Sequence, residues 1–128
     1  MKIWFVDDDD EMAQAVRLML GLLNHEMVKF NNARVAAKCL VQGDRPDLLL
    51  LDINMPEVNG IDMLEFVRRR PEWKGLPILM LSSEATDLQI DQCLELGADG
   101  FVAKPVTIDE LESAIGYVQK KYHMLVKE

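Results

Sequence analysis

Four consecutive aspartates, residues 7–10, follow directly on the apolar run Ile3–Val6. Two like charges about 4 Å apart repel by roughly 4 kcal/mol at the dielectric of a protein surface, so this crowding needs compensation. A bound cation supplies it, and Mg²⁺ in particular binds through one or two carboxylates together with phosphate oxygens and water. The aspartates therefore suggest a magnesium site at the end of a buried segment.

Three other polar side chains stand at the ends of apolar segments. They are Asp52 after Leu48–Leu51, Ser82 after Pro77–Leu81 and Lys104 after Gly100–Ala103. A carboxylate such as Asp52 can act as a nucleophile and form an acyl phosphate. An ammonium group such as Lys104 can hold a phosphoryl oxygen as a point charge. If these segment ends meet, carboxylates, a hydroxyl and an ammonium group form a site for phosphoryl chemistry.

Five short strands alternating with five helices must bring these residues together. The predicted strands are Lys2–Val6, Glu26–Phe30, Leu48–Leu51, Pro77–Leu81 and Gly100–Ala103. Between them, apolar residues recur at helical spacing within 12–23, 35–40, 63–67 and 88–96, and a T-x-x-E capping box at Thr107–Glu110 begins a fifth helix. This alternation predicts an α/β fold, a (βα)5 doubly wound parallel sheet covered on both faces. With the strand order 2-1-3-4-5, Asp7, Asp8 and Asp52 face one another at the carboxyl ends of the strands, where such sheets bind ligands.

Composition narrows the class of protein. The chain has 128 residues, 49% of them hydrophobic, a formal charge of −8 and an isoelectric point near 4.7. These values predict one compact domain and argue against direct nucleic-acid binding, which needs a basic surface. The cluster Arg68–Arg70 is the local exception, and we interpret it as a solvated helix end. Cys39 and Cys93 are expected as buried thiols. No apolar run approaches the length of a membrane span, so we expect a soluble, cytoplasmic protein.

The aspartates also have a simpler interpretation, as caps of the first helix. Acidic side chains suit the positive end of a helix dipole, and for Asp9 and Asp10 capping is the favoured interpretation. For Asp7 and Asp8 it is weak, because capping does not explain why Asp52, Ser82 and Lys104 stand at matching positions.

At these positions the sequence resembles the receiver domain of response regulators in bacterial two-component signalling, a family with a flavodoxin-like fold. The stretches that carry the resemblance are "IWFVDDDD", "LLLLDINMPEVNG", "PILMLSS" and "GADGFVAKP". The D-x-x-M-P-x-x-x-G pattern is highly specific in this setting. The resemblance covers nearly the whole chain, and it implies a receiver domain over residues 1–122, with 123–128 as a C-terminal extension of the last helix or the start of a linker.

The resemblance implies a role for each site residue. Asp52 is the phospho-accepting residue and Lys104 binds the phosphoryl group. The protein ligands of Mg²⁺ are Asp8, Asp52 and the backbone carbonyl of Asn54, with Asp7 assisting through water. The remaining implied features are Ser82 as the switch hydroxyl, Phe101 as a switch side chain and a cis peptide bond before Pro105.

Three positions depart from the commonest pattern. Ser82 replaces a more frequent threonine, so the hydroxyl is kept and a methyl group is lost. Phe101 offers a ring that can swing inward but no phenolic hydroxyl, and plain core packing stays open beside the switch role. Ala13 stands where many relatives have arginine, so partner contacts made through that arginine do not transfer.

The function implied is a phosphorylation-activated switch, not an enzyme with a separate substrate. The phosphoryl donor would be a sensor histidine kinase or a phosphotransfer protein in a phosphorelay. The output would pass through the face made by the fourth helix, fifth strand and fifth helix, to an effector domain, a downstream protein or a phosphorylation-dependent homodimer. Whether the domain stands alone or precedes an effector stays open, and the apolar residues Tyr122, Leu125 and Val126 fit either case.

Two other classes of protein share part of this pattern. A haloacid-dehalogenase-type aspartyl phosphatase also uses a strand-end aspartate and Mg²⁺, but it needs a second acid in D-x-D, and Asn54 occupies that position. A flavin-binding module with the same fold needs a first loop that cradles phosphate with N–H groups, and four carboxylates would repel the phosphate.

Overall fold

The strands and helices alternate along the chain as the sequence predicts. A computed structural model describes residues 1–55, 58–84 and 86–123. Five parallel strands form one sheet in the order β2-β1-β3-β4-β5. The strands are β1 (Lys2–Val6), β2 (Glu26–Phe30), β3 (Leu48–Asp52), β4 (Ile78–Ser82) and β5 (Gly100–Ala103). The (βα)5 prediction and its strand order are confirmed. The C-terminal extension proposed for residues 123–128 lies outside the described residues, apart from His123.

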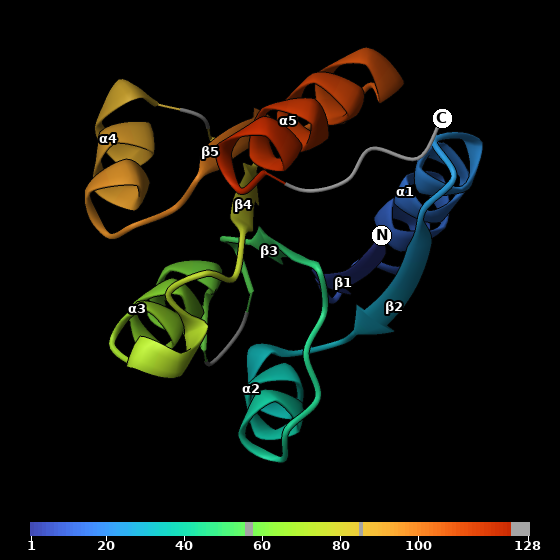
Figure 1. Cartoon of the computed structure of the whole chain (residues 1–128). Helices are drawn as coiled ribbons and strands as arrows, with labels where there is room; N and C mark the ends of the chain where they lie inside the picture. Colours follow the sequence, from blue (N-terminus) through green and yellow to red (C-terminus); the bar gives the residue numbers. More distant parts are fainter. Residues whose placement is uncertain (56–57, 85, 124–128) are drawn as a thin grey trace.

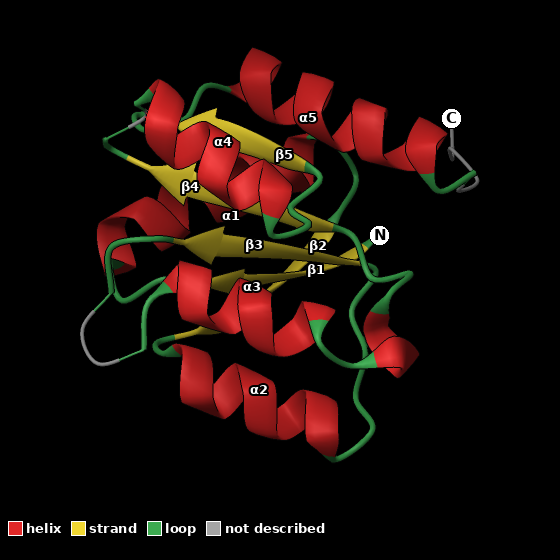
Figure 2. Ribbon diagram, turned by 90° about the vertical axis from the view of Figure 1, so that its left-hand side faces the viewer, coloured by secondary structure: helices red, strands yellow, loops and turns green. Residues whose placement is uncertain are grey.

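Helices cover both faces of this sheet (Figures 1 and 2). They are α1 (Asp10–Leu22), α2 (Ala33–Val41), α3 (Gly60–Arg68), α4 (Asp87–Glu95) and α5 (Ile108–Lys121), with a short 3₁₀ turn η1 (Pro71–Trp73). Buried residues of α1 and α5 pack on one face, and those of α2, α3 and α4 pack on the other. None of the described helices is long and apolar enough to cross a membrane.

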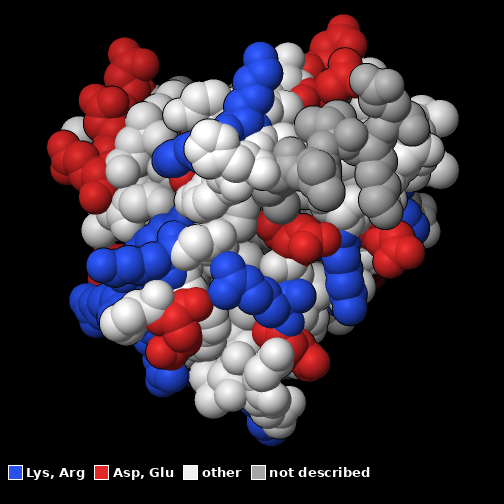
Figure 3. All heavy atoms as spheres, viewed as in Figure 1, with Lys and Arg blue, Asp and Glu red and all other residues white. Residues whose placement is uncertain are grey.

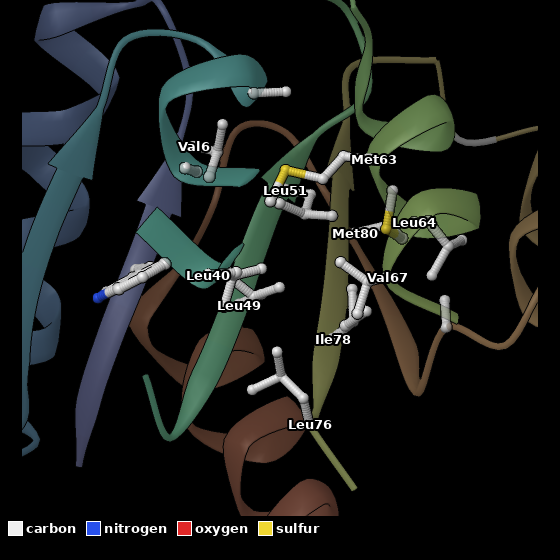
Figure 4. Packing of buried hydrophobic residues seen from close by; sticks show 14 of the residues in the cluster. Val6, Leu40, Leu49, Leu51, Met63, Leu64, Val67, Leu76, Ile78 and Met80 are labelled. Carbon is white, nitrogen blue, oxygen red and sulfur yellow. The ribbon is translucent and has the colours of Figure 1, made fainter. Parts of the chain in front are cut away.

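The central strand β3 joins the two halves of the core. Leu48 and Leu50 belong to the cluster under α1 and α5, whereas Leu49 and Leu51 belong to the cluster under α2 and α3. Figure 4 shows Leu51 beside Met63 of α3 and Leu49 beside Leu40 of α2. Since burying one such side chain stabilises a protein by roughly 1.5–3 kcal/mol, the strand that ends at Asp52 is firmly held.

Each helix start is fixed by a polar side chain. Asp9 caps α1 by accepting a hydrogen bond from the Met12 N–H, which confirms its predicted capping role. Thr107 accepts from the Glu110 N–H, so the predicted start of α5 is also found. The reciprocal capping box occurs elsewhere, at Asn59 and Asp62 before α3. Caps of this kind contribute about 1 kcal/mol each and fix where the loops after the strands end.

Three expectations about burial are wrong. Leu88 is 82% exposed and Leu94 46% exposed, so α4 presents little of its predicted stripe to the core, and Cys93 is its one buried residue. In α2, Val35 is 48% exposed and Cys39 is half-buried rather than buried. Length alone does not explain this, because α3 also has nine residues and buries four of them, whereas α4 buries one.

The interpretation of Arg68 as a solvated cation is also wrong. Its guanidinium donates to the carbonyls of Gly97 and Trp73 and to Asp99 Oδ2, 3.1 Å away. Asp99, which is buried, also accepts from the Ile78 N–H at 2.8 Å and from Lys121 Nζ at 2.6 Å. This carboxylate ties the ends of α3 and α5 to the amino ends of β4 and β5. We define Arg68, Asp99, Lys121 and Tyr122 as the Asp99 network, since the Tyr122 hydroxyl donates to Asp99 as well.

We expect Asp99→Ala to lower the free energy of unfolding by about 3–5 kcal/mol, because Arg68 and the Ile78 N–H would lose a buried partner. Tyr122→Phe removes one hydrogen bond to a charged group and should cost about 1.5–3 kcal/mol. Urea denaturation followed by circular dichroism measures both. Asp109→Ala, at an exposed acid of α5, is the matched control and should change the stability by less than about 0.5 kcal/mol. An Asp99→Ala variant as stable as this control would contradict the role given to the network.

Candidate functional site

The sheet brings the predicted site residues together at the carboxyl ends of its strands. Val6 of β1 pairs with Leu51 of β3, so Asp7 and Asp52, each the next residue, lie side by side. Asp52 and Ser82 are the last residues of β3 and β4 rather than the first residues after them, because each still pairs with the neighbouring strand. Lys104 directly follows β5.

Lys104 connects the two buried carboxylates. Its Nζ lies 3.0 Å from Asp52 Oδ1 and 3.2 Å from Asp7 Oδ2. Asp7 also accepts a hydrogen bond from the Asp9 N–H, at 3.0 Å, through its other oxygen. Asp7 and Lys104, which are 97 positions apart in the sequence, therefore belong to one ion-paired cluster with Asp52.

Asp8 completes a group of three carboxylates. One oxygen each from Asp7, Asp8 and Asp52 lies within 4.8 Å of the others. Asp7 and Asp52 are buried and Asp8 is exposed, so the group opens to solvent on one side. An all-oxygen set with a solvent-facing side fits Mg²⁺, which keeps several waters when it binds to proteins. The fourth predicted ligand, the Asn54 carbonyl, stays a prediction, while the Asn54 N–H lies 3.4 Å from Asp52 Oδ1.

The single cation of this cluster, Lys104, does not balance the charges of the carboxylates. The pKa of Asp52 is raised from its usual 3.8 to about 6: burial raises it most, the hydrogen bond and charge of Lys104 partly offset this, and the charge of Asp7 raises it as well. For Lys104, burial opposes the charged form, but the hydrogen bonds and charges of Asp52 and Asp7 outweigh it, so its pKa is raised. Lys104 is thus a firmly held cation beside a carboxylate that is under electrostatic strain.

The backbone behind Asp52 is held by a close approach of α3. A side chain at Gly60 would put its Cβ 2.4 Å from the Asp52 carbonyl oxygen, well inside van der Waals contact. Gly60 is the last residue of the D-x-x-M-P-x-x-x-G stretch, so this spacing has a steric reason that sequence reasoning did not give. Two residues within the stretch, Pro56 and Glu57, lie outside the described residues.

The remaining predicted residues flank the cluster. Ser82 is buried, and its hydroxyl accepts a hydrogen bond from the Glu84 N–H at 3.0 Å. Phe101 is half-buried in β5 and packs against the core cluster under α2 and α3. The Lys104–Pro105 peptide bond is cis, as the resemblance implies.

Comparison with known proteins identifies the family. The family model of the response regulator receiver domain matches residues 3–116. The chain belongs to this family. The receiver is 36% identical over 121 residues to the chemotaxis protein CheY-3 of Vibrio cholerae, with 90% of this chain and 88% of that protein covered. The structure of Vibrio cholerae CheY4 has a TM-score of 0.81 and 30% identity, and the match covers 91% of this chain and 97% of that chain.

A second group of relatives is longer than this receiver. The chain is 34% identical over 122 residues to the transcriptional regulatory protein CpxR of Escherichia coli, and the match covers 95% of this chain but 50% of CpxR. The chain therefore spans about half the length of the curated relatives of this kind. What CpxR does through its other half is not transferred to this receiver.

We expect Asp52→Asn to stabilise the receiver in the absence of divalent metal, by about 1–3 kcal/mol at pH 7.5. The folded protein raises the pKa of Asp52 to about 6, so the ionised carboxyl is penalised on folding. That penalty is complete above about pH 6, decreases as the pH falls, and vanishes below about pH 4, where the group is protonated in both states. The difference between variant and parent should follow this course in urea denaturation with EDTA.

The control is Asp44→Asn, which neutralises an exposed acid far from the cluster. Its effect on the stability at pH 7.5 should be small. If Asp52→Asn destabilised the receiver at pH 7.5, the strain assigned to Asp52 would be wrong.

Proposed function

We propose that this receiver is a switch that accepts a phosphoryl group on Asp52 in a Mg²⁺-dependent reaction. The observation that carries the proposal is the cluster of Asp7, Asp8 and Asp52 with Lys104 paired to both buried carboxylates. The donor would be a phosphohistidine of a sensor histidine kinase or of a phosphotransfer protein. The receiver catalyses this transfer to itself and the later hydrolysis, and it acts on no other substrate.

The proposed transfer is a displacement at phosphorus. An oxygen of Asp52 forms the new O–P bond as the P–N bond of the phosphohistidine breaks, and the electron pair of that bond stays on the imidazole nitrogen. Lys104, already 3.0 Å from Asp52 Oδ1, would neutralise part of the charge on the phosphoryl oxygens. The main chain of buried Asp52 is held in place, because α3 starts at Gly60 against its carbonyl and β3 pairs with β4.

Asp8, Asp52 and the Asn54 carbonyl would hold the Mg²⁺ ion, with Asp7 acting through water. When bound, the ion neutralises the carboxylates and draws phosphoryl oxygens towards Asp52. The residues suit this role because the three carboxylates are close together, while the single ammonium group of Lys104 pairs with only two of them, Asp7 and Asp52.

We propose that the output is a shift in the face formed by α4, β5 and α5. Ser82 would leave its hydrogen bond with the Glu84 N–H and donate to the phosphoryl group, which moves the loop after β4. Phe101, on the adjacent strand, has the size to fill the space that opens. This is how a local change of charge biases a two-state surface.

We expect one phosphoryl group to be added when the receiver is incubated with acetyl phosphate and Mg²⁺, and intact-mass spectrometry measures it. The product should be an acyl phosphate, stable to mild acid and cleaved by hydroxylamine. Asp52→Asn should abolish the addition. Persistent labelling of one site in Asp52→Asn would show that another residue is the acceptor.

Two variants with equal charge change separate the metal site from helix capping. Asp8→Asn should weaken Mg²⁺ binding and slow the labelling, because Asp8 belongs to the carboxylate group. Asp10→Asn, in the first turn of α1, is the matched control and should leave both nearly unchanged. A larger effect from Asp10 than from Asp8 would contradict the proposed ligand set.

Ser82→Ala should still accept phosphate but should shift only partly to the active form, whereas Lys104→Ala should be labelled and remain nearly unresponsive. Moving a population from 1:99 to 99:1 requires about 5.5 kcal/mol. One charge-assisted hydrogen bond supplies roughly 1.5–3 kcal/mol, so Ser82 alone cannot do this and Lys104 must contribute. NMR shifts of Phe101 and of α4 amides, with and without beryllofluoride, measure the response.

Ser83→Ala is the control for the hydroxyl, since Ser83 is the exposed neighbour of buried Ser82. This variant should respond like the parent protein. A full response from Ser82→Ala would remove the hydroxyl from the coupling mechanism.

A further inference from the structure

We propose that the surface made by α4, β5 and the first half of α5 binds a cationic segment of a partner protein that has an apolar anchor, and that it disfavours a second copy of this chain. The inference rests on the proposed output face and adds the chemistry of what that face recognises. Charge, apolar exposure and the absence of internal neutralisation each support it.

The charge of the protein is concentrated in this part of the chain. Between residues 83 and 119 the sequence has eight acidic residues and one cation, Lys104. Two of these charges are engaged in the interior: Asp99 in its network, and Lys104 with Asp7 and Asp52. Figure 3 shows acidic side chains over α4, and basic side chains gathered away from it. The surface of α4 and of the start of α5 is therefore acidic.

The acids on this surface have no cationic partner among residues 1–55, 58–84 and 86–123. Exposed acids recur along α4 at Asp87, Asp91 and Glu95, and two more, Asp109 and Glu110, stand in the first turn of α5. Within the described part of the chain, none of these five forms an ion pair. The cations of α5 lie in its last turn, where Lys121 is bound to Asp99. The described residues therefore leave these acids available to a cation from another molecule.

The same surface exposes apolar groups. A groove between β5 and α5 is lined by Leu79, Gly100, Phe101, Val102, Asp109, Glu110, Ser113, Ala114 and Tyr117. The side chain of Tyr117, which lines this groove, is 56% exposed. Two acidic residues, Asp109 and Glu110, line the same groove. On α4, Leu88 and Leu94 are also exposed. Exposed apolar groups beside unpaired acids suit a ligand with an aliphatic or aromatic side chain next to lysine or arginine.

A second copy of the chain is a poor ligand for this surface. In a symmetric pair the same face meets itself, so the acids of α4 and α5 would oppose acids of the same elements. Like charges across an interface oppose association, whereas complementary charges speed and direct it. Phosphorylation of Asp52 would add negative charge nearby and, through Phe101, alter the groove that this ring lines.

The test uses the full 128-residue chain and a fluorescein-labelled helical peptide built from lysine and leucine with one tryptophan. Fluorescence anisotropy should show binding that strengthens when beryllofluoride and Mg²⁺ are added and weakens with salt. The double variant Asp91→Asn/Glu95→Gln should weaken binding by about fivefold, as expected for the loss of two exposed charge pairs. Tyr117→Ser should weaken it as well, because it removes part of the apolar anchor site.

The matched control is Asp44→Asn/Glu26→Gln, which removes the same charge from exposed positions elsewhere. It should change binding by less than about twofold. Equal losses of peptide affinity in the two double variants would overturn the proposal, since they would show that the peptide is attracted only by the net charge of the protein.

Sedimentation equilibrium with beryllofluoride should show a monomer. A dimer that Tyr117→Ser dissociates would also overturn the proposal. NMR shifts of Ser82 and Lys104 with beryllofluoride report the proposed switch independently, so failure of the switch and failure of the partner proposal can be told apart.

Discussion

The repulsion among three carboxylates, only two of which pair with the one nearby ammonium group, is the constraint on which the rest of this receiver depends. Asp7, Asp8 and Asp52 offer oxygens within 4.8 Å of one another, and Lys104 pairs with the two that are buried. A cluster of this kind is costly to a folded protein unless it has further compensation. The fold tolerates this repulsion because both core clusters hold the strands that end at these carboxylates. The carboxylates therefore cannot move apart through a shift of the backbone.

The two ends of the sheet use charge in opposite ways. At the carboxyl ends, three carboxylates surround one lysine, and this excess of acid suits the cation and the phosphoryl group that we propose. At the amino ends, Asp99 is a single carboxylate with two cationic partners, a tyrosine hydroxyl and a backbone N–H. The first arrangement is unsatisfied and suited to change, whereas the second is satisfied and suited to fixing α3 and α5 on the sheet.

The sequence predicts a feature well where local pattern decides it. Each predicted strand was found within one residue of its observed limits, because apolar runs such as Leu48–Leu51 have to be buried on both faces. The site residues could be named because strand ends converge in any parallel sheet of this kind. Arg68 was misread because its partners Gly97 and Asp99 lie about 30 residues away, and nothing in a run of three arginines shows which one turns inward. The exposure of Leu88 and Leu94 was missed for a related reason, since periodicity marks an apolar stripe but does not show how much sheet remains to cover it.

Gly60 has a consequence for how the receiver can accommodate added volume. Because α3 starts against the main-chain carbonyl of Asp52, the peptide of Asp52 cannot shift towards α3, and no side chain lies between them that could rotate aside. If a phosphoryl group is added to the Asp52 carboxylate as proposed, a backbone adjustment at Asp52 would be directed away from α3, towards the ends of β4 and β5, where Ser82 and Phe101 lie. The absence of a Cβ atom at Gly60 therefore determines on which side of Asp52 the backbone has room to move.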